Sequence, residues 1–515
     1  MSIKLEIKGI GVFWQKKRYL FSNFKLKLNP MRKILTFIFA TFITGSLFAG
    51  GLVTNNNQSA MFTRLQSRNA STAIDAVYFN PAGLTKLEDG FYASVSNQII
   101  RQTKTVTNNY GFLSGTKPRE YVGDVTANFF PDVYVGYKTG KFAFSAGFGP
   151  VGGGGGAKYE EGLPSFEMRI ADLVPGLASQ LLPVDNAIKA ITGTDPGFRN
   201  ITGYSSDILF EGTSVYLGFQ GNVSYKINDW LSIAAGARYV SAKDTYKGYI
   251  QGVEIDAPEI YGGSQTPGDY LRTVYTLTGS NPAFGALPVF ATYLDDATTV
   301  EADAELTGNG YTPILSVNIS PMENLNIAVR YEFQTKLEMK TTVFDGKDAE
   351  GMFIQDSVAI KDMPAFLSAG IEFKPMEKLM LSGSFNYYFD KNVDYDGQED
   401  VEVNKIDDNF LEFGLGAEYG LTEKLRISAG WSATITGVNS DYQSDMTYST
   451  NTNSFGGGLG FRITPMIDLN IGGQYTMYAE DTKSFNHMLG TVPVPVVETY
   501  NKKTWLIGAG LDFSF

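Results

Sequence analysis

Apolar and polar residues alternate along most of the chain. Over residues 505–515, one face carries Trp, Ile, Ala, Leu and Phe side chains, and the other carries Gly, Asp and Ser. Over residues 325–333, an unbroken apolar face lies opposite Asn326, Arg330 and Glu332. A period of two residues is typical of β-strands with one apolar and one polar face. The pattern therefore predicts an all-β protein.

The connections between the predicted strands alternate between short turns and long, polar, acidic loops. Short turns lie at residues 227–231, 321–325, 375–379, 421–425 and 465–469. Short turns at one end and long loops at the other are typical of outer-membrane barrels. Counting between these marks gives about 14 strands, an even number that allows an antiparallel barrel to close. The strands are predicted near residues 91–106, 122–138, 141–151, 207–227, 230–250, 300–319, 324–341, 356–374, 378–390, 408–420, 424–437, 450–463, 467–481 and 500–515.

A closed barrel suits a membrane because it leaves no unpaired strand edge in lipid, where each unsatisfied backbone group costs several kcal/mol. Strands of roughly ten residues are long enough to cross the hydrocarbon when tilted. After residue 50, no run of 18 apolar residues predicts a transmembrane helix. The chain ends on Phe515 after an amphipathic strand. This is the kind of terminal strand that the barrel assembly machinery recognises, so we expect a bacterial outer-membrane location among outer-membrane lipid and lipopolysaccharide.

A secretory signal precedes the barrel. Arg32 and Lys33 follow Met31, residues 34–44 are apolar but too short to span a bilayer, and small residues follow up to Ala49. We expect residues 1–49 to form the signal region, with Met31 as the true start. The other interpretation is a long basic region that begins at Met1.

Residues 50–89 are small, polar and irregular, and they contain the tripeptide Asn80-Pro81-Ala82. A short segment without strand pattern, placed ahead of a long series of membrane-type strands, fits inside the barrel that those strands close. We therefore predict a 14-stranded antiparallel transmembrane β-barrel over residues 90–515, with an N-terminal hatch over residues 50–89 that plugs its lumen.

Composition and charge remove several classes of function. The chain has no Cys and a single His, His487, which argues against disulfides, thiolate chemistry, zinc sites and a His-based triad. We place His487 in a solvated loop. The net charge is −12, and without residues 1–33 the remaining 33 basic and 53 acidic residues give −20. This acidity argues against a nucleic-acid partner. We expect no cofactor, no metal and no enzymatic activity; the acidic run at residues 390–408 lacks the spacing of a calcium loop and is interpreted as a solvated outer loop.

Three features together resemble the FadL family of outer-membrane transporters for long-chain fatty acids and other hydrophobic compounds. These are Asn80-Pro81-Ala82 after the signal, about 14 strands behind it, and the terminal Phe515. The resemblance covers residues 50–515. It implies a 14-stranded monomeric barrel whose hatch carries Asn80, Pro81 and Ala82. It also implies that substrate enters at outer loops, moves through an apolar interior and leaves sideways through a gap at a kinked third strand.

The third strand offers a candidate for that gap. Residues 142–151 run into a glycine-rich stretch that includes Pro150. Gly and Pro interrupt ladder pairing and permit bulges. The alternative is a flexible loop at the end of a strand; a phosphate-binding loop is excluded because no Gly-Lys-Ser/Thr follows. The candidate residues for the lateral opening are Gly147, Gly149, Pro150 and Gly152.

Two outer loops are rich in apolar residues. Residues 163–191 show near-helical spacing that we expect to break at Pro175 and Pro183, and a second apolar loop covers residues 270–293. Exposed apolar surface is costly unless it is used. The loops are therefore expected either to form a docking groove for acyl chains or hydrocarbons, or to pack on each other and cap the barrel. The candidate groove residues are Phe166, Ile170, Leu173, Leu177, Leu271, Phe284 and Phe290.

A fatty-acid carboxylate would require a cation inside the barrel. Four arginines are candidates, two on polar strand faces and two in the hatch: Arg238, Arg330, Arg64 and Arg68. The alternative for each is an interior ion pair with an acid such as Glu332, Glu412 or Glu418.

We therefore expect a transporter for the passive uptake of long-chain fatty acids or aromatic hydrocarbons, with hydrophobic small molecules as its ligands. The alternatives are a general polar porin, a structural outer-membrane barrel and an outer-membrane hydrolase. A plug of about 40 residues argues against the porin, and a lone imidazole argues against the hydrolase. The sequence leaves open which hydrophobic substrate is carried.

Overall fold

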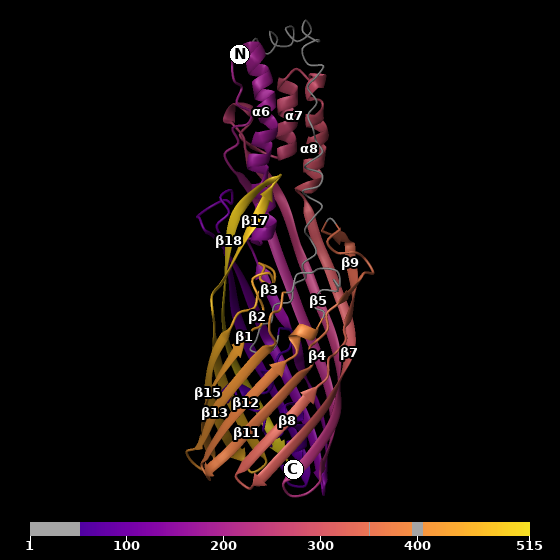
Figure 1. The fold of residues 1–515 in the computed structure, drawn as a ribbon, viewed down its shortest axis with the longest axis vertical. Helices are drawn as coiled ribbons and strands as arrows, with labels where there is room; N and C mark the ends of the chain where they lie inside the picture. The colour runs from indigo at the N-terminus through magenta and orange to yellow at the C-terminus, as the bar shows by residue number, and fades with distance from the viewer. Residues whose placement is uncertain (1–51, 350, 394–404) are drawn as a thin grey trace.

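The computed structural model describes residues 52–349, 351–393 and 405–515 of the chain. In this part, one antiparallel sheet curls round and closes on itself (Figure 1). Closure is made by β1 (Gly90–Asn108), which pairs with β2 (Arg119–Thr139) on one side and with β18 (Val492–Ser514) on the other. The predicted signal region and residues 394–404 of the acidic run lie outside the described residues.

The wall of the barrel has fourteen antiparallel staves, where a stave is one strand or two strands that continue each other along the wall. This confirms the predicted fold class. The pairs β8 and β9, β10 and β11, and β16 and β17 each act as one stave, and the short β6 only adds to β5. The remaining strands are β3 (Phe142–Tyr159), β4 (Tyr204–Lys226), β5 (Leu231–Asp256), β6 (Ser264–Gln265), β7 (Val300–Met322), β8 (Leu325–Glu332), β9 (Glu338–Asp348), β10 (Val358–Ile360), β11 (Phe366–Met376), β12 (Leu379–Tyr388), β13 (Phe410–Gly420), β14 (Leu425–Ile435), β15 (Thr452–Thr464), β16 (Ile467–Tyr478) and β17 (Asp481–Leu489).

None of the helices in the described residues is both long and apolar enough to cross a membrane.

The two faces of the wall follow the alternation in the sequence. Near the C-terminal end of the barrel, the outward residues Phe91, Val95 and Ile99 of β1 are exposed, whereas the inward Ser94 and Gln98 between them are buried. An outward apolar band with a polar interior is what a membrane-spanning barrel presents to lipid and to its lumen.

Some staves are far longer than this band. Strand β5 has 26 residues, and β4, β7 and β18 have 23 each. Roughly ten residues of a tilted strand suffice to cross the hydrocarbon. The outer parts of these strands therefore extend the barrel well beyond the apolar band, and Figure 1 shows β4, β5 and β7 reaching beyond shorter strands such as β12 and β13.

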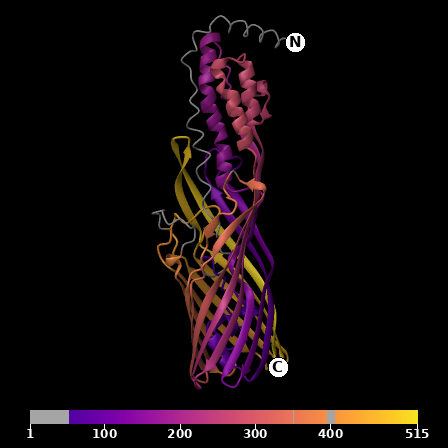
Figure 2. The same cartoon turned by 90° about the vertical axis from the view of Figure 1, so that its right-hand side faces the viewer.

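Turns and loops are segregated as predicted. The short turns lie at the end of the barrel where the C-terminus is found, and the helices stand at the opposite end (Figures 1 and 2). The main helices are α5 (Pro164–Ala171), α6 (Leu173–Thr192), α7 (Pro267–Leu277) and α8 (Ala286–Ala297).

The expected helix breaks at two prolines are wrong. Pro175 lies in the first turn of α6, where a missing N–H costs nothing because that N–H would have no helical partner. Pro183 lies inside α6, which continues past it to Thr192. The break falls instead at Asp172, between α5 and α6.

Residues 52–87 occupy the lumen, with helices α3 (Ala60–Arg64) and α4 (Ala76–Phe79) and the 3-10 helix η1 (Pro81–Lys86). Nearly all of these residues are buried, and α3 and η1 contact strands on opposite sides of the wall, β16 and β4. We call this segment the hatch. Its many polar side chains bond to inward polar residues of the strands, which is how a polar segment can be buried without loss.

Candidate functional site

The tripeptide Asn80-Pro81-Ala82 anchors the hatch to the wall. The Asn80 amide donates to Asn318 Oδ1 at 2.7 Å and accepts from Ser316 Oγ at 3.1 Å. The Pro81 carbonyl accepts a hydrogen bond of 2.7 Å from Ser224 Oγ. All three residues are fully buried. Asn80 thus supplies both a donor and an acceptor at one point of the wall, a role that a longer or apolar side chain could not fill.

A buried cluster of charge lies against the hatch residue Tyr78. Arg238 forms a two-point ion pair with Glu332, with N–O distances of 2.6 and 2.8 Å. Arg330 bonds to the Tyr78 carbonyl and lies 3.3 Å from Glu332. Both guanidinium groups stack near the Tyr78 ring, at 5.1 and 4.7 Å from its centre. One carboxylate is therefore shared by two arginines, and the aromatic ring of the hatch lies beside both.

The other two candidate arginines belong to the hatch itself. Arg64 pairs with Glu418 and donates to Asn470 Oδ1 at 2.9 Å, which fastens the hatch to the wall. Arg68 pairs with Asp75, also in the hatch, at 2.7 Å.

All four candidate arginines therefore already contact an acid of the protein, which is the alternative that the sequence left open for each. Arg330 differs from the other three because its Nε and Nη2 groups are buried without a hydrogen-bond partner among the described residues. It is the candidate with donors to spare, although Glu332 stands beside it.

The third stave carries a break in the wall. Strand β3 pairs with β2 over Phe142–Phe148 and again at Lys158–Tyr159, but the ladder is interrupted between these stretches. Residues 125–132 of β2 and 149–157 of β3 have no ladder partner in each other. The pairing of β3 with β4 also shifts register twice between Pro150 and Gly155. The interruption coincides with the glycine- and proline-rich stretch.

The hatch fills this break on the lumen side. Thr54 forms an antiparallel bridge with Gly152, with backbone bonds from Asn55 N to the Val151 carbonyl at 2.9 Å and from Gly153 N to the Val53 carbonyl at 3.0 Å. Residues 53–55 thus replace part of the missing β2 ladder. We call them the hatch strand.

Side chains next to the hatch strand complete the closure. Gln58 Nε2 donates to the Pro150 carbonyl at 2.7 Å, and the backbone N–H of Ser59 donates to Asp132 Oδ2 at 3.1 Å. Gly149 leaves room for both, because a Cβ placed there would lie 2.7 Å from Asp132 Oδ1 and 2.7 Å from Gln58 Oε1. The glycine is required by the close approach of the hatch.

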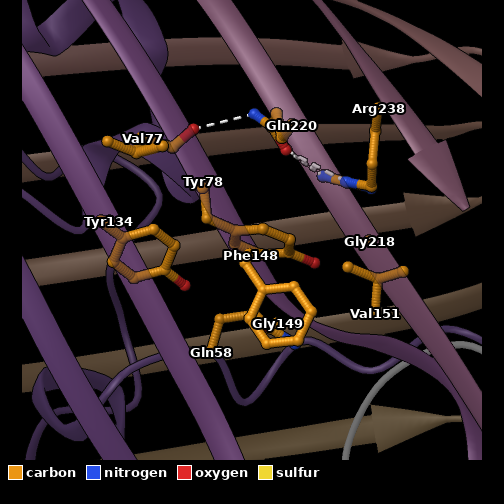
Figure 3. Close-up of a pocket in the computed structure, with 11 residues that line it drawn as sticks. Gln58, Val77, Tyr78, Tyr134, Phe148, Gly149, Val151, Gly218, Gln220 and Arg238 are labelled. Atoms are coloured by element: carbon orange, nitrogen blue, oxygen red, sulfur yellow. Dashed lines mark hydrogen bonds between the residues drawn. The ribbon is translucent and has the colours of Figure 1, made fainter.

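A narrow cavity of about 10 Å³ lies just inside the break, which is room for about one water molecule (Figure 3). The hatch contributes Gln58, Val77 and Tyr78 to its lining, and the wall contributes residues such as Phe148 and Arg238. In Figure 3 these side chains converge on one small space. The passage from the lumen to the break is therefore closed by side chains in this structure.

The candidate groove residues pack into the protein interior. Phe166, Ile170, Leu177, Leu271, Phe284 and Phe290 are at most 8% exposed, and Leu173 packs against the same core. The two outer loops contact each other through the segment before β4, where the Tyr270 hydroxyl donates to the Phe198 carbonyl and the Tyr261 hydroxyl to the Pro196 carbonyl. The structure thus shows the two loops packed together, the second of the two arrangements that the sequence allowed.

The expected loop position of His487 is wrong. The residue lies in β17, where its Nε2 is 2.8 Å from Asp172 Oδ2 and its ring lies edge-on to Tyr110, with centres 4.8 Å apart. Tyr110 donates to the other oxygen of Asp172, and burial together with this carboxylate raises the pKa of Tyr110. The imidazole therefore ties the base of α6 to β17.

Comparison with known proteins was made on sequence and on structure. A scan against family models finds no match, and no curated protein matches the sequence. The fold is similar to the crystal structure of a Pseudomonas aeruginosa FadL homologue, with 13% identity and a TM-score of 0.57 over 92% of this chain and 100% of that one. It is also similar to the Pseudomonas putida toluene transporter TodX, with 13% identity and a TM-score of 0.51 over 86% and 95% of the two chains. The chain therefore has the fold of these FadL-type barrels.

Proposed function

We propose that this chain is an outer-membrane transporter for the passive uptake of hydrophobic molecules. Residues 90–515 form its barrel, residues 50–89 its hatch, and Asn80, Pro81 and Ala82 the point where the hatch is fastened. The substrate enters at the helical end, passes down the barrel and leaves sideways between β2 and β3 at Gly147, Gly149, Pro150 and Gly152. The likeness to the toluene transporter and to the FadL homologue supports this class of cargo.

One observation carries the proposal: the β2–β3 ladder is interrupted over residues 149–157, and the hatch strand occupies the break. A general porin needs an open lumen, whereas here buried hatch residues fill it. A sideways exit gives a hydrophobic molecule a route into the membrane that does not pass through water. Transfer into the apolar membrane is favourable for such a molecule. The hatch strand is held by backbone bonds and, beside it, by Gln58 and by the bond from the Ser59 N–H to Asp132, so its release is cheap compared with removal of the whole hatch.

A reversible crosslink tests the route. The chain has no Cys, so the pair Asn55→Cys and Val151→Cys introduces a single possible disulfide between the hatch strand and β3. The two residues are the pair next to the antiparallel bridge of Thr54 with Gly152, and the Asn55 N–H donates to the Val151 carbonyl at 2.9 Å, which places their Cα atoms within disulfide range. Entry of toluene into liposomes should fall at least roughly tenfold on oxidation, a barrier increase of about 1.4 kcal/mol. It should recover when the disulfide is reduced.

The matched control places the same crosslink in a closed part of the wall. Leu381→Cys with Ala417→Cys joins β12 to β13, which are paired without interruption. Oxidation of this control should leave the flux unchanged. Equal flux through the oxidised and reduced forms of the hatch-strand variant would contradict a β2–β3 exit, and steady ionic conductance of the unmodified protein would contradict the transporter in favour of a porin.

A further inference from the structure

Two basic residues stand on the outside of the barrel, at the edge of the apolar band that faces away from the C-terminal end. On β1, Arg101 is the next outward residue after Ile99, going towards the helices. On β18, Lys503 is the next outward residue after Trp505 in the same direction. Arg101 lies opposite Trp505 in the ladder, and Lys503 lies opposite Thr103, so the two cations are diagonal neighbours. Such neighbours are about 7–8 Å apart, which lets two long side chains reach one ligand.

Neither cation has an acid as its partner among the described residues. Arg101 donates to the Ile100 carbonyl at 2.9 Å and to Asn128 Oδ1 at 2.7 Å, which fixes the guanidinium group and leaves it with further N–H donors. Lys503 is exposed and makes no hydrogen bond or ion pair with the described part of the chain. An outward acid of the next strand, Asp124, accepts a hydrogen bond from Thr103 Oγ1 at 3.2 Å and lies opposite Lys158.

Lysines elsewhere on the outside of the wall are treated differently. Five of them, on outward faces of β3, β5 and β9, each lie within ion-pair distance of an acid. These pairs are Lys158–Glu160, Lys243–Glu305, Lys247–Asp303, Lys340–Asp356 and Lys347–Glu301. The wall therefore neutralises these cations with its own carboxylates, and it leaves Arg101 and Lys503 for an anion from outside.

Aromatic rings border the two cations on the side of the apolar band. Trp505 and Tyr475 are directly opposite in the ladder of β18 and β16, and each is 45% exposed on the outside. Trp and Tyr are enriched where a membrane protein passes from hydrocarbon to head groups. The height of Arg101 and Lys503 is therefore that of the lipid head groups.

A third ring is held outward by a bulge. Phe129 is 84% exposed and lies where the register of β1 and β2 shifts. Asn97 of β1 holds the backbone on both sides of this ring, because its Nδ2 donates to the Asn128 carbonyl at 3.0 Å and its Oδ1 accepts from the Phe130 N–H at 2.9 Å. A bulge that re-aims a side chain is a built feature of a sheet. Phe129 thus projects towards lipid next to Asn128, the residue that orients Arg101.

We propose that Arg101 and Lys503 bind a phosphate group of a lipid in the outer leaflet, with Trp505 and Phe129 against its first acyl carbons. Guanidinium and ammonium groups give phosphate the charge-assisted hydrogen bonds that it takes best. The site opens sideways at the edge of the apolar band, which suits a phosphate that carries acyl chains better than a soluble anion. Phe129 also belongs to the part of β2 that has no ladder partner in β3, so the bound lipid lies beside the break. The proposal uses only the outer-membrane location from the proposed function and concerns a partner other than the transported molecule.

The test compares one lipid with and without its phosphates. Binding of diphosphoryl lipid A and of the same lipid after removal of its phosphates is measured by native mass spectrometry of the delipidated protein. The variant Arg101→Gln with Lys503→Gln removes both charges and keeps polar side chains. Its affinity for diphosphoryl lipid A should fall roughly 10-fold or more, as expected for lost hydrogen bonds to charged groups. Its affinity for the dephosphorylated lipid should stay unchanged.

The matched control removes the same net charge from the opposite end of the barrel. Lys141→Gln with Lys378→Gln replaces two exposed lysines at the short turns, and this variant should bind diphosphoryl lipid A as the parent does. An equal loss in the control would overturn the proposal, because binding would then follow net charge alone.

Three further results separate the possibilities. Equal binding of diphosphoryl lipid A by the parent and by the double variant overturns the proposal. Displacement of the lipid by inorganic phosphate at matched concentration overturns it in favour of a site for soluble anions. If the double variant does not insert, Lys503→Gln alone is judged by the same criteria, since Lys503 has no bond to lose in the described part of the chain. Toluene flux does not enter this comparison, so the lipid site can fail while the transporter stands, and the reverse.

Discussion

The ladder between two neighbouring strands, which we call a seam, is continuous at some glycine-rich positions of this wall and interrupted at another. Strands β12 and β13 are joined by ten consecutive residue pairs, from Leu379 with Tyr419 to Tyr388 with Phe410. Strand β15 carries three successive glycines, Gly456–Gly458, yet it pairs continuously with both neighbours at that point. The seam between β2 and β3 is open over residues 149–157. Glycine alone therefore does not open a seam.

What distinguishes the open seam is proline and the hatch. Pro150 has no N–H to give to a ladder, and the hatch strand takes the position that β2 would occupy beside Gly152. In the closed seams, glycines serve the hatch in another way. A Cβ at Gly458 would lie 2.6 Å from the Cβ of Arg64, so the missing side chain allows the hatch to approach an intact ladder.

The hatch is accordingly fastened unequally to the two sides. On the side of β13 to β16 it is held by the ion pair of the buried Arg64 with the half-buried Glu418 and by the bond from Arg64 to Asn470. On the side of β3 it is held by backbone bonds of residues 53–55, by Gln58 and by the bond from the Ser59 N–H to Asp132. Under the proposed function, the ion-paired side would stay in place while the hatch strand is released, so that a side exit opens without loss of the hatch from the barrel.

The largest effect is expected from the anchor. Arg64→Met removes the hydrogen-bonded arginine of the half-buried Glu418 carboxylate and leaves only Arg426, at 3.9 Å, as its cation, which should lower the free energy of unfolding by about 2 kcal/mol. The measurement is the urea midpoint of the refolded barrel in lipid. Adding Glu418→Met should restore most of the loss, because replacing both charges by apolar groups is close to neutral. A double variant as unstable as the single one would show that the pair is not what holds the hatch.

A smaller effect is expected from crowding the releasable strand. Gly149→Val places a side chain where Asp132 and Gln58 now lie, which should displace the hatch strand and raise toluene flux roughly tenfold, a loss of about 1.4 kcal/mol in closure. The control is Gly221→Val in β4, where a Cβ meets nothing within 4 Å. Flux through the Gly149 variant equal to that of the control would mean that residues 53–55 do not limit passage.

The smallest effect is expected from restoring a backbone hydrogen-bond donor to β3 at the β2–β3 seam. Pro150→Val restores one N–H to β3, and a single added hydrogen bond is worth about 0.5–1.5 kcal/mol. Toluene flux should fall by a factor of roughly two to ten, as far as the new bond favours the closed ladder. A rise in flux would indicate that Pro150 keeps the hatch strand in place instead of keeping the seam open.

Much of the barrel could be predicted from the sequence because strand period, turn length and an even count are local signals. The position of the break could also be predicted, since Pro150 and its neighbouring glycines stand out in a strand. The hatch strand that fills the break could not be predicted, because residues 53–55 have no strand pattern of their own. They pair only because Gly152 lies beside them in the folded barrel.

The contacts between charged residues inside the barrel also could not be predicted from local sequence. The partner of Arg238 is Glu332, 94 residues further along the chain, and only strand register brings them together. Lys104 and Lys502 are still further apart, and barrel closure makes them neighbours. A signal was available here, because the first and last staves of a closed barrel must pair, and both lysines lie on inward faces at similar distances from the two ends of the barrel domain. The helical loops misled the prediction at Pro183, because packing along α6 outweighs the lost backbone bond.

The length of the longest strands sets how far the helices α7 and α8 stand from the membrane. About 15 residues of β5 continue past the part needed to cross the hydrocarbon, and at ordinary strand rise and tilt they lift α7 and α8 roughly 40 Å above it. Under the proposed function, a hydrophobic molecule received at the helices would be taken up at this height, and the tall cylinder would carry it to the bilayer through a hydrated zone in which it dissolves poorly.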